Sequence, residues 1–364
     1  MKNKKNIFVV VAAAVFMFGF SVFGIIASDK EISVSERRPL AKFPQISAEK
    51  IFDGSFAGNF EKYSLDQFPL RDGFRTLKAF TSKNILRQKD NNGLYYADGY
   101  LSKLDFPENL DSVKRATNRF NEIIKEYADK NARVFFSVIP DKNYFLAEKN
   151  GYPAMDYEKL ISFAKDSMKT SEYIDIIDLL EISDYYKTDS HWRQECITDV
   201  AKRIAEKTGT VLNEKYTVKK LGNNFFGVYA GQSALPVPSE SIVCLETDET
   251  KKSTVYDAET NGFIPVYNLE KLKEPDQYET FLSGSKSLLK IKNPNGPKGK
   301  KLVVFRDSFS SSLAPLLISG YSELTLVDIR YISPKLLKNF VDFSGCDILF
   351  LYSTGILNNS VTIK

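Results

Sequence analysis

Short apolar runs alternate with amphipathic segments along the C-terminal part of the chain. The runs at 302–305, 324–328 and 347–352 are too short for buried helices and predict buried strands. The segments between them, 310–318 and 333–341, predict helices. Because strands and helices alternate, the pattern predicts a βαβαβ arrangement, with a parallel sheet and right-handed crossovers.

The middle of the chain contributes further elements of both kinds. Helices are predicted over about 110–129, 157–170 and 193–207, and strands over 132–139 and 173–178. The run at 132–139 is apolar and rich in β-forming residues, which is typical of a strand buried on both faces. We therefore expect an α/β fold with a central, mainly parallel sheet.

Residues 210–285 interrupt this alternation. They carry Tyr, Val, Gly and Pro with little helical period, which predicts a β-rich insertion. The segment 285–301 that follows is dense in Lys, Gly, Asn and Pro and predicts an exposed linker with a solvated surface. Earlier in the chain, Asn-Gly and Asp-Gly pairs within 92–100 predict a hairpin.

The longest apolar stretch lies at the N-terminus. Residues 7–27 form 21 consecutive positions without a charge, about the length of a helix that crosses a bilayer. The lysines before this stretch are expected to stay in the cytoplasm. We therefore expect residues 1–28 to be a cytoplasmic tip and an uncleaved signal anchor. A cleaved signal peptide is the alternative, although its apolar region is usually only about 7–15 residues long.

A stalk and a helical stretch are predicted after the anchor. Residues 29–46 contain two prolines that disfavour helix before them, which predicts an extended stalk. One domain is predicted over 47–364; it begins with helix from about 47 to 80, interrupted at 66–72. Four aromatic residues recur near helical spacing in this stretch, and we expect them to pack in a core: Phe56, Phe60, Tyr63 and Phe68.

Composition excludes several classes of protein. With 43% hydrophobic and 26% charged residues, the 364-residue chain is globular rather than disordered. The net charge is +4; without the three lysines before the apolar stretch, 47 basic residues stand against 46 acidic ones, which is no nucleic-acid-binding footprint. Three widely spaced cysteines and one histidine predict neither a disulfide framework nor a soft-ligand metal site. The composition still allows one disulfide bond and a carboxylate site for a hard cation. No cofactor is predicted.

The sole histidine is the first candidate for chemistry. His191 stands within Asp189-Ser190-His191-Trp192, which places a carboxylate two positions from an imidazole. Histidine is the one side chain whose unperturbed pKa falls between about 5 and 8, so His191 is the candidate general base. The alternative is a residue that merely begins the helix predicted at 193.

Ser308 is the candidate nucleophile. It follows the strand at 302–305 and precedes the helix at 310–318, so it should project from the carboxyl edge of the parallel sheet, where functional sites collect. Backbone N–H groups at the start of the helix could stabilise an oxyanion there. Its hydroxyl needs a base to become nucleophilic, and His191 is available. The alternative role for Ser308 is a helix N-cap.

Several stretches together resemble the DHHW protein family and its relatives, the alginate O-acetyltransferase proteins of SGNH (GDSL) hydrolase-like fold. The pairing of Asp189-Ser190-His191-Trp192 with the later Asp307-Ser308-Phe309 carries the resemblance. Other stretches agree in the same order: Arg38-Pro39-Leu40-Ala41 with Phe43-Pro44, Asp66-Gln67-Phe68-Pro69-Leu70-Arg71-Asp72, Ile139-Pro140-Asp141-Lys142, Phe226-Gly227, and Val327-Asp328-Ile329-Arg330-Tyr331. The similarity thus covers nearly the whole chain after the anchor.

The resemblance implies a three-layer αβα fold and a triad. In that triad Ser308 is the nucleophile, His191 the general base and then acid, and Asp189 the residue that holds the imidazole tautomer. It also implies acetyl transfer to a cell-surface polysaccharide, with a membrane-bound O-acyltransferase as the partner that handles the acetyl donor. Together with the anchor, this predicts a single-pass membrane protein whose C-terminal domain is extracellular.

Two departures from the family pattern affect the site. Ser190 replaces the first histidine of the family's name motif, and Arg306 stands where related hydrolases often have glycine. The second change either alters the strand-to-helix turn or places a cation beside the substrate. Arg306, Trp192 and Lys142 are therefore candidate substrate-binding residues, although a buried aromatic role for Trp192 is the alternative.

Three functions follow, in order of preference. The first is an anchored acetyltransferase or acetyl esterase, which differ only in whether a glycan hydroxyl or water accepts the acyl group. The second is an inactive surface protein that keeps the fold to bind glycan or to act as an envelope scaffold, since fold does not guarantee activity. A subtilisin-like protease, which also has Asp, His and Ser in this chain order, comes third because Asp189 and His191 share one loop.

Overall fold

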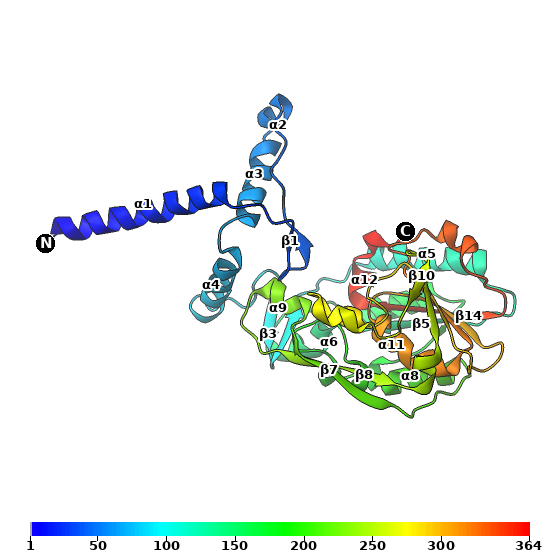
Figure 1. Ribbon diagram of the computed structural model, residues 1–364. Helices are drawn as coiled ribbons and strands as arrows, with labels where there is room; N and C mark the ends of the chain where they lie inside the picture. The colour runs from blue at the N-terminus through cyan, green and yellow to red at the C-terminus, as the bar shows by residue number, and fades with distance from the viewer. Residues whose placement is uncertain (1) are drawn as a thin grey trace. The chain divides into compact units, whose positions relative to one another are not determined.

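The computed structural model describes residues 2–364 and divides the chain into two compact units (Figure 1). The N-terminal unit comprises the chain up to Asn92 together with Ala230–Pro236. The α/β unit comprises Gly93–Tyr229 and Val237–Lys364. The boundary after Asn92 differs from the predicted one at residue 47, because the helices between these positions contact the stalk and Ala230–Pro236.

An eight-stranded sheet forms the centre of the α/β unit, in the order β10-β9-β11-β13-β12-β14-β5-β6. The five strands β13, β12, β14, β5 and β6 are parallel, whereas β11, β9 and β10 pair antiparallel at one side. The predicted mainly parallel sheet is thus confirmed. The strands are β5 (Val134–Ile139), β6 (Glu172–Tyr173), β9 (Thr254–Asp257), β10 (Gly262–Ile264), β11 (Leu288–Lys292), β12 (Lys301–Arg306), β13 (Glu323–Val327) and β14 (Cys346–Ser353).

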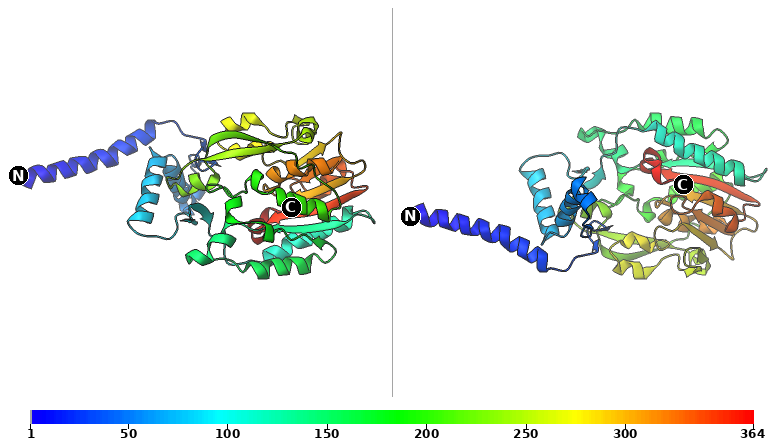
Figure 2. Two further views of the ribbon diagram at one scale, coloured as in Figure 1. Left: turned by 90° about the horizontal axis from the view of Figure 1, so that it is seen from below. Right: turned by 90° about the horizontal axis from the view of Figure 1, so that it is seen from above.

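Helices cover both faces of this sheet and complete three layers (Figure 2). Successive residues of a strand point to opposite faces, so Val304 of β12 joins one apolar cluster and Phe305 joins the other. The first cluster contains α8 (Thr198–Lys207) and α11 (Ser310–Leu317). The second contains α5 (Leu110–Tyr127), α7 (Tyr157–Ser167) and α12 (Thr354–Asn358).

Three predicted elements are shorter than expected. The strand predicted at 173–178 ends at Tyr173, because the Asp175 side chain accepts a hydrogen bond from the Ile177 N–H and forms a turn. The helix predicted at 333–341 is only a 3-10 helix, Pro334–Asn339. The helix predicted from 193 begins at Thr198, after a 3-10 turn. His191 therefore lies in a loop rather than at a helix start.

The segment predicted as a β-rich insertion is divided between two sheets. Within it, β7 (Thr217–Phe225) and β8 (Glu240–Glu246) form a separate antiparallel pair, whereas β9 and β10 extend the central sheet. Two short helices, α9 (Val228–Ser233) and α10 (Asp248–Lys252), interrupt the strands. The predicted hairpin is present as β3 (Leu94–Ala97) and β4 (Tyr100–Lys103).

Among the described residues, the N-terminal unit contains α1 to α4, the larger part of α9 and one small strand pair. The helix α1 (Lys2–Ile26) is long and apolar enough over Lys4–Ile26 to cross a membrane. The predicted stalk is not one extended segment. It turns back on itself, because β1 (Ile32–Ser33) pairs antiparallel with β2 (Arg38–Pro39). Three shorter helices follow: α2 (Ala48–Phe52), α3 (Ser55–Asp66) and α4 (Arg71–Asn84).

The aromatic residues of the first helical stretch do not pack in a core as predicted. Every residue of α3 is at least partly exposed, and Phe60 and Phe68 retain 42% and 37% of their accessible surface. Helical spacing identified a shared apolar face correctly. It did not identify what covers that face, because periodicity carries no information about the partner.

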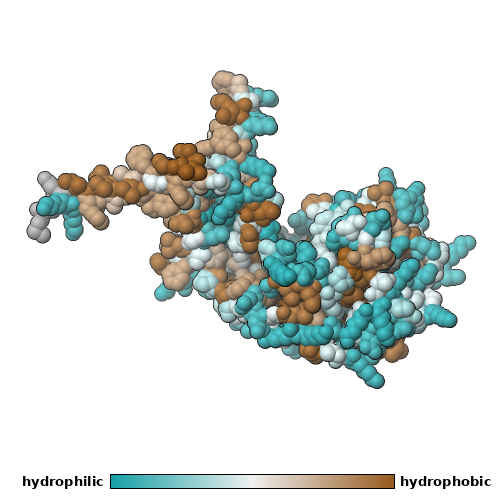
Figure 3. Space-filling view, in the orientation of Figure 1, coloured by the Kyte–Doolittle hydropathy of each residue, from teal (hydrophilic) through white to brown (hydrophobic). Residues whose placement is uncertain are grey.

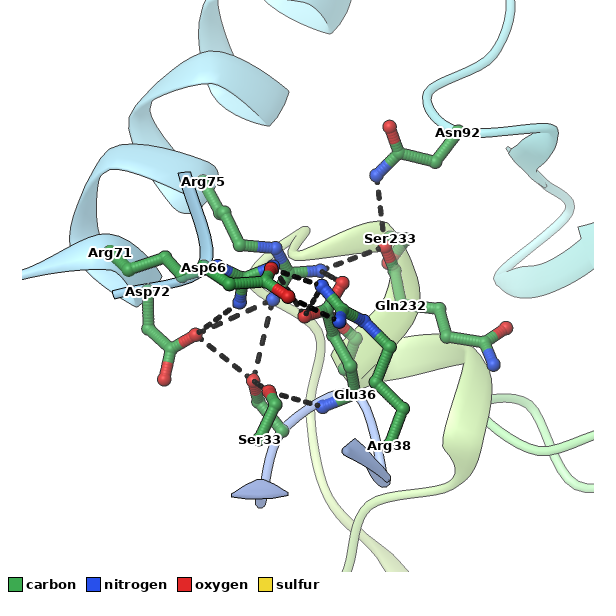
Figure 4. A network of polar contacts seen from close by, with 12 residues as sticks. Ser33, Glu36, Arg38, Asp66, Arg71, Asp72, Arg75, Asn92, Gln232 and Ser233 are labelled. Atoms are coloured by element: carbon green, nitrogen blue, oxygen red, sulfur yellow. Dashed lines mark hydrogen bonds and ion pairs between the residues drawn. The ribbon is translucent and has the colours of Figure 1, made fainter. Parts of the chain in front are cut away.

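A polar network binds the segment around Asp66 to the stalk (Figure 4). Asp66 accepts two hydrogen bonds from the Arg38 guanidinium, at 2.6 and 2.9 Å, and these lower the pKa of Asp66 to about 2. Arg71 and Arg75 of α4 both pair with Glu36. Charged residues therefore hold the predicted 66–72 interruption, together with the ring contacts of Phe68 with Phe20 and Phe74.

The core of the α/β unit should be sensitive to loss of Phe350. This fully buried ring on β14 lies 4.8 Å from the ring of Phe120 and 4.8 Å from that of Phe305. We expect Phe350→Ala to lower the free energy of unfolding by about 3–5 kcal/mol, because it leaves a cavity in the second apolar cluster, between the sheet and its helices. Urea unfolding followed through Trp192, the only tryptophan, measures the change. The control Val211→Ala alters an 86% exposed side chain and should change stability by less than about 0.5 kcal/mol.

Candidate active site

A serine, a histidine and an aspartate from two distant segments meet at the carboxyl end of β12. Ser308 follows β12, and its Oγ lies 2.8 Å from Nε2 of His191. His191 Nδ1 lies 2.5 Å from Oδ1 of Asp189. The three residues therefore form a continuous hydrogen-bonded chain. Ser308 is half-buried and the His191 side chain retains 13% exposure, so the chain of bonds reaches the surface.

The Asp189 carboxylate is almost wholly buried, and both of its oxygens are bonded. Oδ1 also accepts a hydrogen bond from the His191 backbone N–H at 3.1 Å, and Oδ2 accepts one from the Val228 N–H at 2.8 Å. A buried carboxylate is stable only with such partners. Gly227 permits this approach, since a Cβ there would lie 2.3 Å from Cβ of Asp189.

Two charged side chains fix the loop that precedes His191. The Glu240 carboxylate accepts hydrogen bonds from the backbone N–H groups of Lys187 and Thr188 at 2.7 and 2.8 Å, and from the Thr188 hydroxyl at 2.7 Å. The Lys142 Nζ donates to the carbonyls of Tyr186 and Lys187 at 3.0 and 3.3 Å. The loop is thus held through its N–H groups on one side and its carbonyls on the other.

Lys142 fills this role as a buried amine. It is 2% exposed, and burial lowers its pKa to about 7. A neutral amine keeps two N–H donors, which matches the two carbonyls that it contacts. The Tyr229 ring lies 5.0 Å from Nζ and covers it further.

Aromatic residues fix the plane of the imidazole. The Tyr278 ring stacks on His191 with centroids 3.9 Å apart and an angle of 5° between the planes. Tyr278 is itself held by a 2.9 Å hydrogen bond between its hydroxyl and that of Ser312. Trp192 donates from Nε1 to the Phe309 carbonyl and to the Ser312 hydroxyl, both at 3.0 Å. These contacts join the loop that carries His191 to Phe309 and to the first turn of α11.

The turn at Ser308 leaves one backbone donor available. The Asp307 carboxylate accepts hydrogen bonds from the N–H groups of Phe309 and Ser353, at 3.1 and 2.7 Å, and so fixes the turn. Within residues 2–364 the Ser308 N–H has no hydrogen-bond partner. An oxyanion formed beside Ser308 could accept from this group.

The three candidate substrate-binding residues all lie in the interior. Trp192 and Arg306 are 0% exposed and Lys142 is 2% exposed. Arg306 donates to the Ser311 hydroxyl at 3.0 Å and to the Lys286 carbonyl at 3.3 Å, and burial lowers its pKa. Each of the three therefore has hydrogen-bond partners within the protein, and its contact with substrate stays a prediction.

Sequence reasoning did not identify Glu240, Val228 or Tyr278. All three lie in the segment predicted as a β-rich insertion, and no local motif marks them. Gly227 appeared only within a matching Phe-Gly pair, without a role. The three cysteines are free in the structure, so the disulfide that the sequence left open is not formed.

Comparison with solved structures identifies the fold. A DHHW family protein from Eubacterium siraeum matches 75% of this chain and 94% of its own length, with a TM-score of 0.61 and 22% sequence identity. The chain has the fold of a DHHW family protein. PatB1 from Bacillus cereus, in a structure that carries a sulfonyl adduct, matches 74% of this chain and 96% of its own, with a TM-score of 0.58 and 16% identity.

The SGNH hydrolase-like fold that the motifs implied is therefore confirmed. No family model matches the sequence. No curated protein matches it either. At these levels of identity the structural likeness establishes the fold, and the site has to be judged from its own geometry.

The buried amine of Lys142 should give the fold a characteristic pH dependence. Because its pKa is about 7 when folded and about 10.5 when unfolded, the unfolded chain binds more protons between these values. The stability of the wild type should therefore rise with pH relative to Lys142→Met, by at most about 1.4 kcal/mol per pH unit. Urea unfolding of both proteins at about pH 6, 8 and 9.5 measures the difference. Parallel pH profiles would contradict the burial of a neutral amine.

Proposed function

We propose that the chain is an extracytoplasmic, membrane-anchored acyl-ester enzyme that transfers acetyl groups to a cell-surface polysaccharide. Ser308 is its nucleophile, His191 its general base and acid, and Asp189 the residue that orients the imidazole. The 2.8 Å contact between Ser308 Oγ and His191 Nε2 is the observation that carries the proposal. The acetyl group, the glycan acceptor and a membrane-bound O-acyltransferase partner come from the motif resemblance.

The reaction begins when His191 Nε2 takes the hydroxyl proton of Ser308 as Oγ attacks the carbonyl carbon of an acetyl donor. The resulting oxyanion accepts a hydrogen bond from the Ser308 N–H. His191 then gives the proton to the leaving group, and an acetyl-serine ester remains. In the second half, His191 takes a proton from a glycan hydroxyl, which attacks the ester, and returns that proton to Ser308 Oγ. With water as the acceptor, the same steps hydrolyse the ester.

Asp189 and Tyr278 act on the imidazole in this sequence. Asp189 accepts from Nδ1, which leaves the lone pair of Nε2 directed at the serine, and it stabilises the imidazolium that forms. The stacked Tyr278 ring keeps the imidazole plane from rotating. The loop contacts of Glu240 and Lys142 are made before substrate binds, so the geometry is organised in advance.

The apolar helix α1 supports the proposed location. Its length and composition suit a single membrane span, with the basic residues before it in the cytoplasm and the chain after it outside. A cleaved signal sequence satisfies the same test. Detection of α1 in the mature protein by mass spectrometry of the membrane fraction separates these alternatives.

The geometry favours an enzyme over an inactive glycan-binding protein. A serine hydroxyl beyond reach of the histidine would have favoured the inactive alternative. The two atoms instead lie within hydrogen-bond distance, and the carboxylate behind them is fully bonded.

Replacement of the nucleophile or the base should remove the activity. We expect Ser308→Ala and His191→Ala each to lower kcat/KM on a small activated acetate ester roughly a thousandfold or more, with little further loss in the double variant. A sulfonyl fluoride should label Ser308 in the wild type and not in His191→Ala, as read by mass spectrometry. The control Ser344→Ala, which removes the hydroxyl of an exposed residue, should keep both activity and labelling. Equal turnover in wild type and both triad variants would refute the proposal.

The close approach of Gly227 to Asp189 provides a second test. In Gly227→Ala the new methyl group would meet the Cβ and backbone of Asp189, so the carboxylate must move from the imidazole. We expect kcat to fall by at least about tenfold, with KM nearly unchanged, as for Asp189→Asn. The matched control Gly222→Ala places its methyl group in open space and should keep full activity. Full activity of Gly227→Ala would show that the Asp189 position is unimportant.

A further inference from the structure

The helix α4 has the reverse of the side-chain distribution expected in a water-soluble protein. Its buried residues are the small Ala79 and Ser82. Leu77 and Phe80 point outward and retain 59% and 48% of their accessible surface, and Leu70 at its N-cap retains 73%. With Phe74 these residues are spaced four, three and three apart, so they form one stripe along the helix. We call this stripe the α4 apolar face.

Polar contacts keep the α4 apolar face turned outward. On the opposite side of the helix, Arg75 donates to the carbonyls of Gly231 and Gln232 at 2.8 and 3.1 Å (Figure 4). Just beyond the helix, Asn91 donates to the Ser233 carbonyl at 2.8 Å. Rotation of α4 to hide its leucines would break these bonds. The exposure is therefore fixed by the packing of the N-terminal unit.

The α4 apolar face is continuous with the apolar helix α1. The Phe20 ring of α1 stacks on Phe68 with centroids 5.5 Å apart, and Phe16 meets the edge of Phe74 at 6.5 Å. Phe20 lies six residues before the end of α1 at Ile26, or roughly 9 Å along the helix axis. Any lipid that surrounds this part of α1 also reaches the residues packed against it.

We propose that the α4 apolar face lies in the lipid bilayer, at the boundary of headgroups and acyl chains in the leaflet that α1 leaves. This inference rests on the membrane anchoring included in the proposed function. A depth of roughly 9 Å agrees with the 5–10 Å at which interfacial amphipathic helices bury their apolar side. Apolar residues along α1 and around α4 are visible together in Figure 3.

The charge of this segment identifies the kind of lipid surface. Residues 71–90 contain six Lys or Arg residues against two Asp, and two of the six, Arg71 and Arg75, pair with Glu36. A basic amphipathic helix with exposed aromatic and aliphatic residues binds membranes through buried apolar area and attraction to anionic headgroups. We therefore expect the contact to strengthen as the fraction of anionic lipid rises.

Tryptophan fluorescence of the full chain in lipid vesicles tests the proposal. Phe80→Trp places a reporter on the α4 apolar face, and the native Trp192, which is 0% exposed, gives a constant background. The matched control is Phe263→Trp at a 74% exposed position of the α/β unit, and Phe18→Trp on α1 reports the anchor. Each variant is reconstituted in phosphatidylcholine vesicles with and without phosphatidylglycerol, and quenching by brominated phosphatidylcholine is measured.

We expect brominated lipid to quench Phe80→Trp at least about twofold more than Phe263→Trp, most strongly with bromine near the headgroup and with phosphatidylglycerol present. Quenching of Phe18→Trp with none of Phe80→Trp would overturn the inference and leave the anchor intact. Absence of quenching at both positions would overturn the inference and the anchored location, whereas the esterase test would still stand. Emission of Phe80→Trp that shifts to the blue without quenching would also overturn it, since protein rather than lipid would then cover the face.

Discussion

The candidate site depends on one buried carboxylate. Asp189 sits where an unpaired charge would be costly, and it is tolerated because each oxygen has a partner. Those partners are the imidazole and a backbone N–H of the next segment. Satisfying the carboxylate therefore also orients His191 and draws Val228 toward it. Gly227, just before Val228, allows the backbone to come this close to Asp189. Glu240 holds Lys187 and Thr188, the residues just before Asp189, in place.

The sheet and the position of Ser308 could be predicted from the sequence because the determinants are local. An apolar run, a short polar turn and an amphipathic segment define the strand, the turn and the helix without knowledge of the rest of the chain. His191 was identifiable through its rarity and its neighbouring aspartate. Their proximity was not predictable from spacing, since 117 residues separate them. The family resemblance supplied that link, and in the structure the two side chains lie 2.8 Å apart.

The residues that hold the triad in place could not be predicted from the sequence, because their contacts also join distant segments. Tyr278 and Glu240 act through shape and through backbone contacts, and nothing in their immediate sequence distinguishes them from ordinary aromatic and acidic positions. The burial of Arg306 and Lys142 was also not predicted from the sequence. Charged residues are usually exposed, so their place near the nucleophile suggested substrate contact. Both are instead enclosed, with carbonyl and hydroxyl oxygens as partners. The exposed aromatic residues of α3 show a similar limit. Helical spacing in the sequence identifies which residues share a face of the helix, but it does not identify what packs against that face.

The single histidine has a practical consequence for spectroscopy. In most hydrolases the imidazole resonances of a catalytic residue must be separated from those of several others. Here every histidine ring signal in a nuclear magnetic resonance spectrum belongs to the site. The Nδ1 nitrogen of that ring lies 2.5 Å from Oδ1 of Asp189, so its signal reports on this contact. Tautomer, protonation and ring dynamics of this one residue can therefore be followed in the unmodified protein when a candidate ester is added.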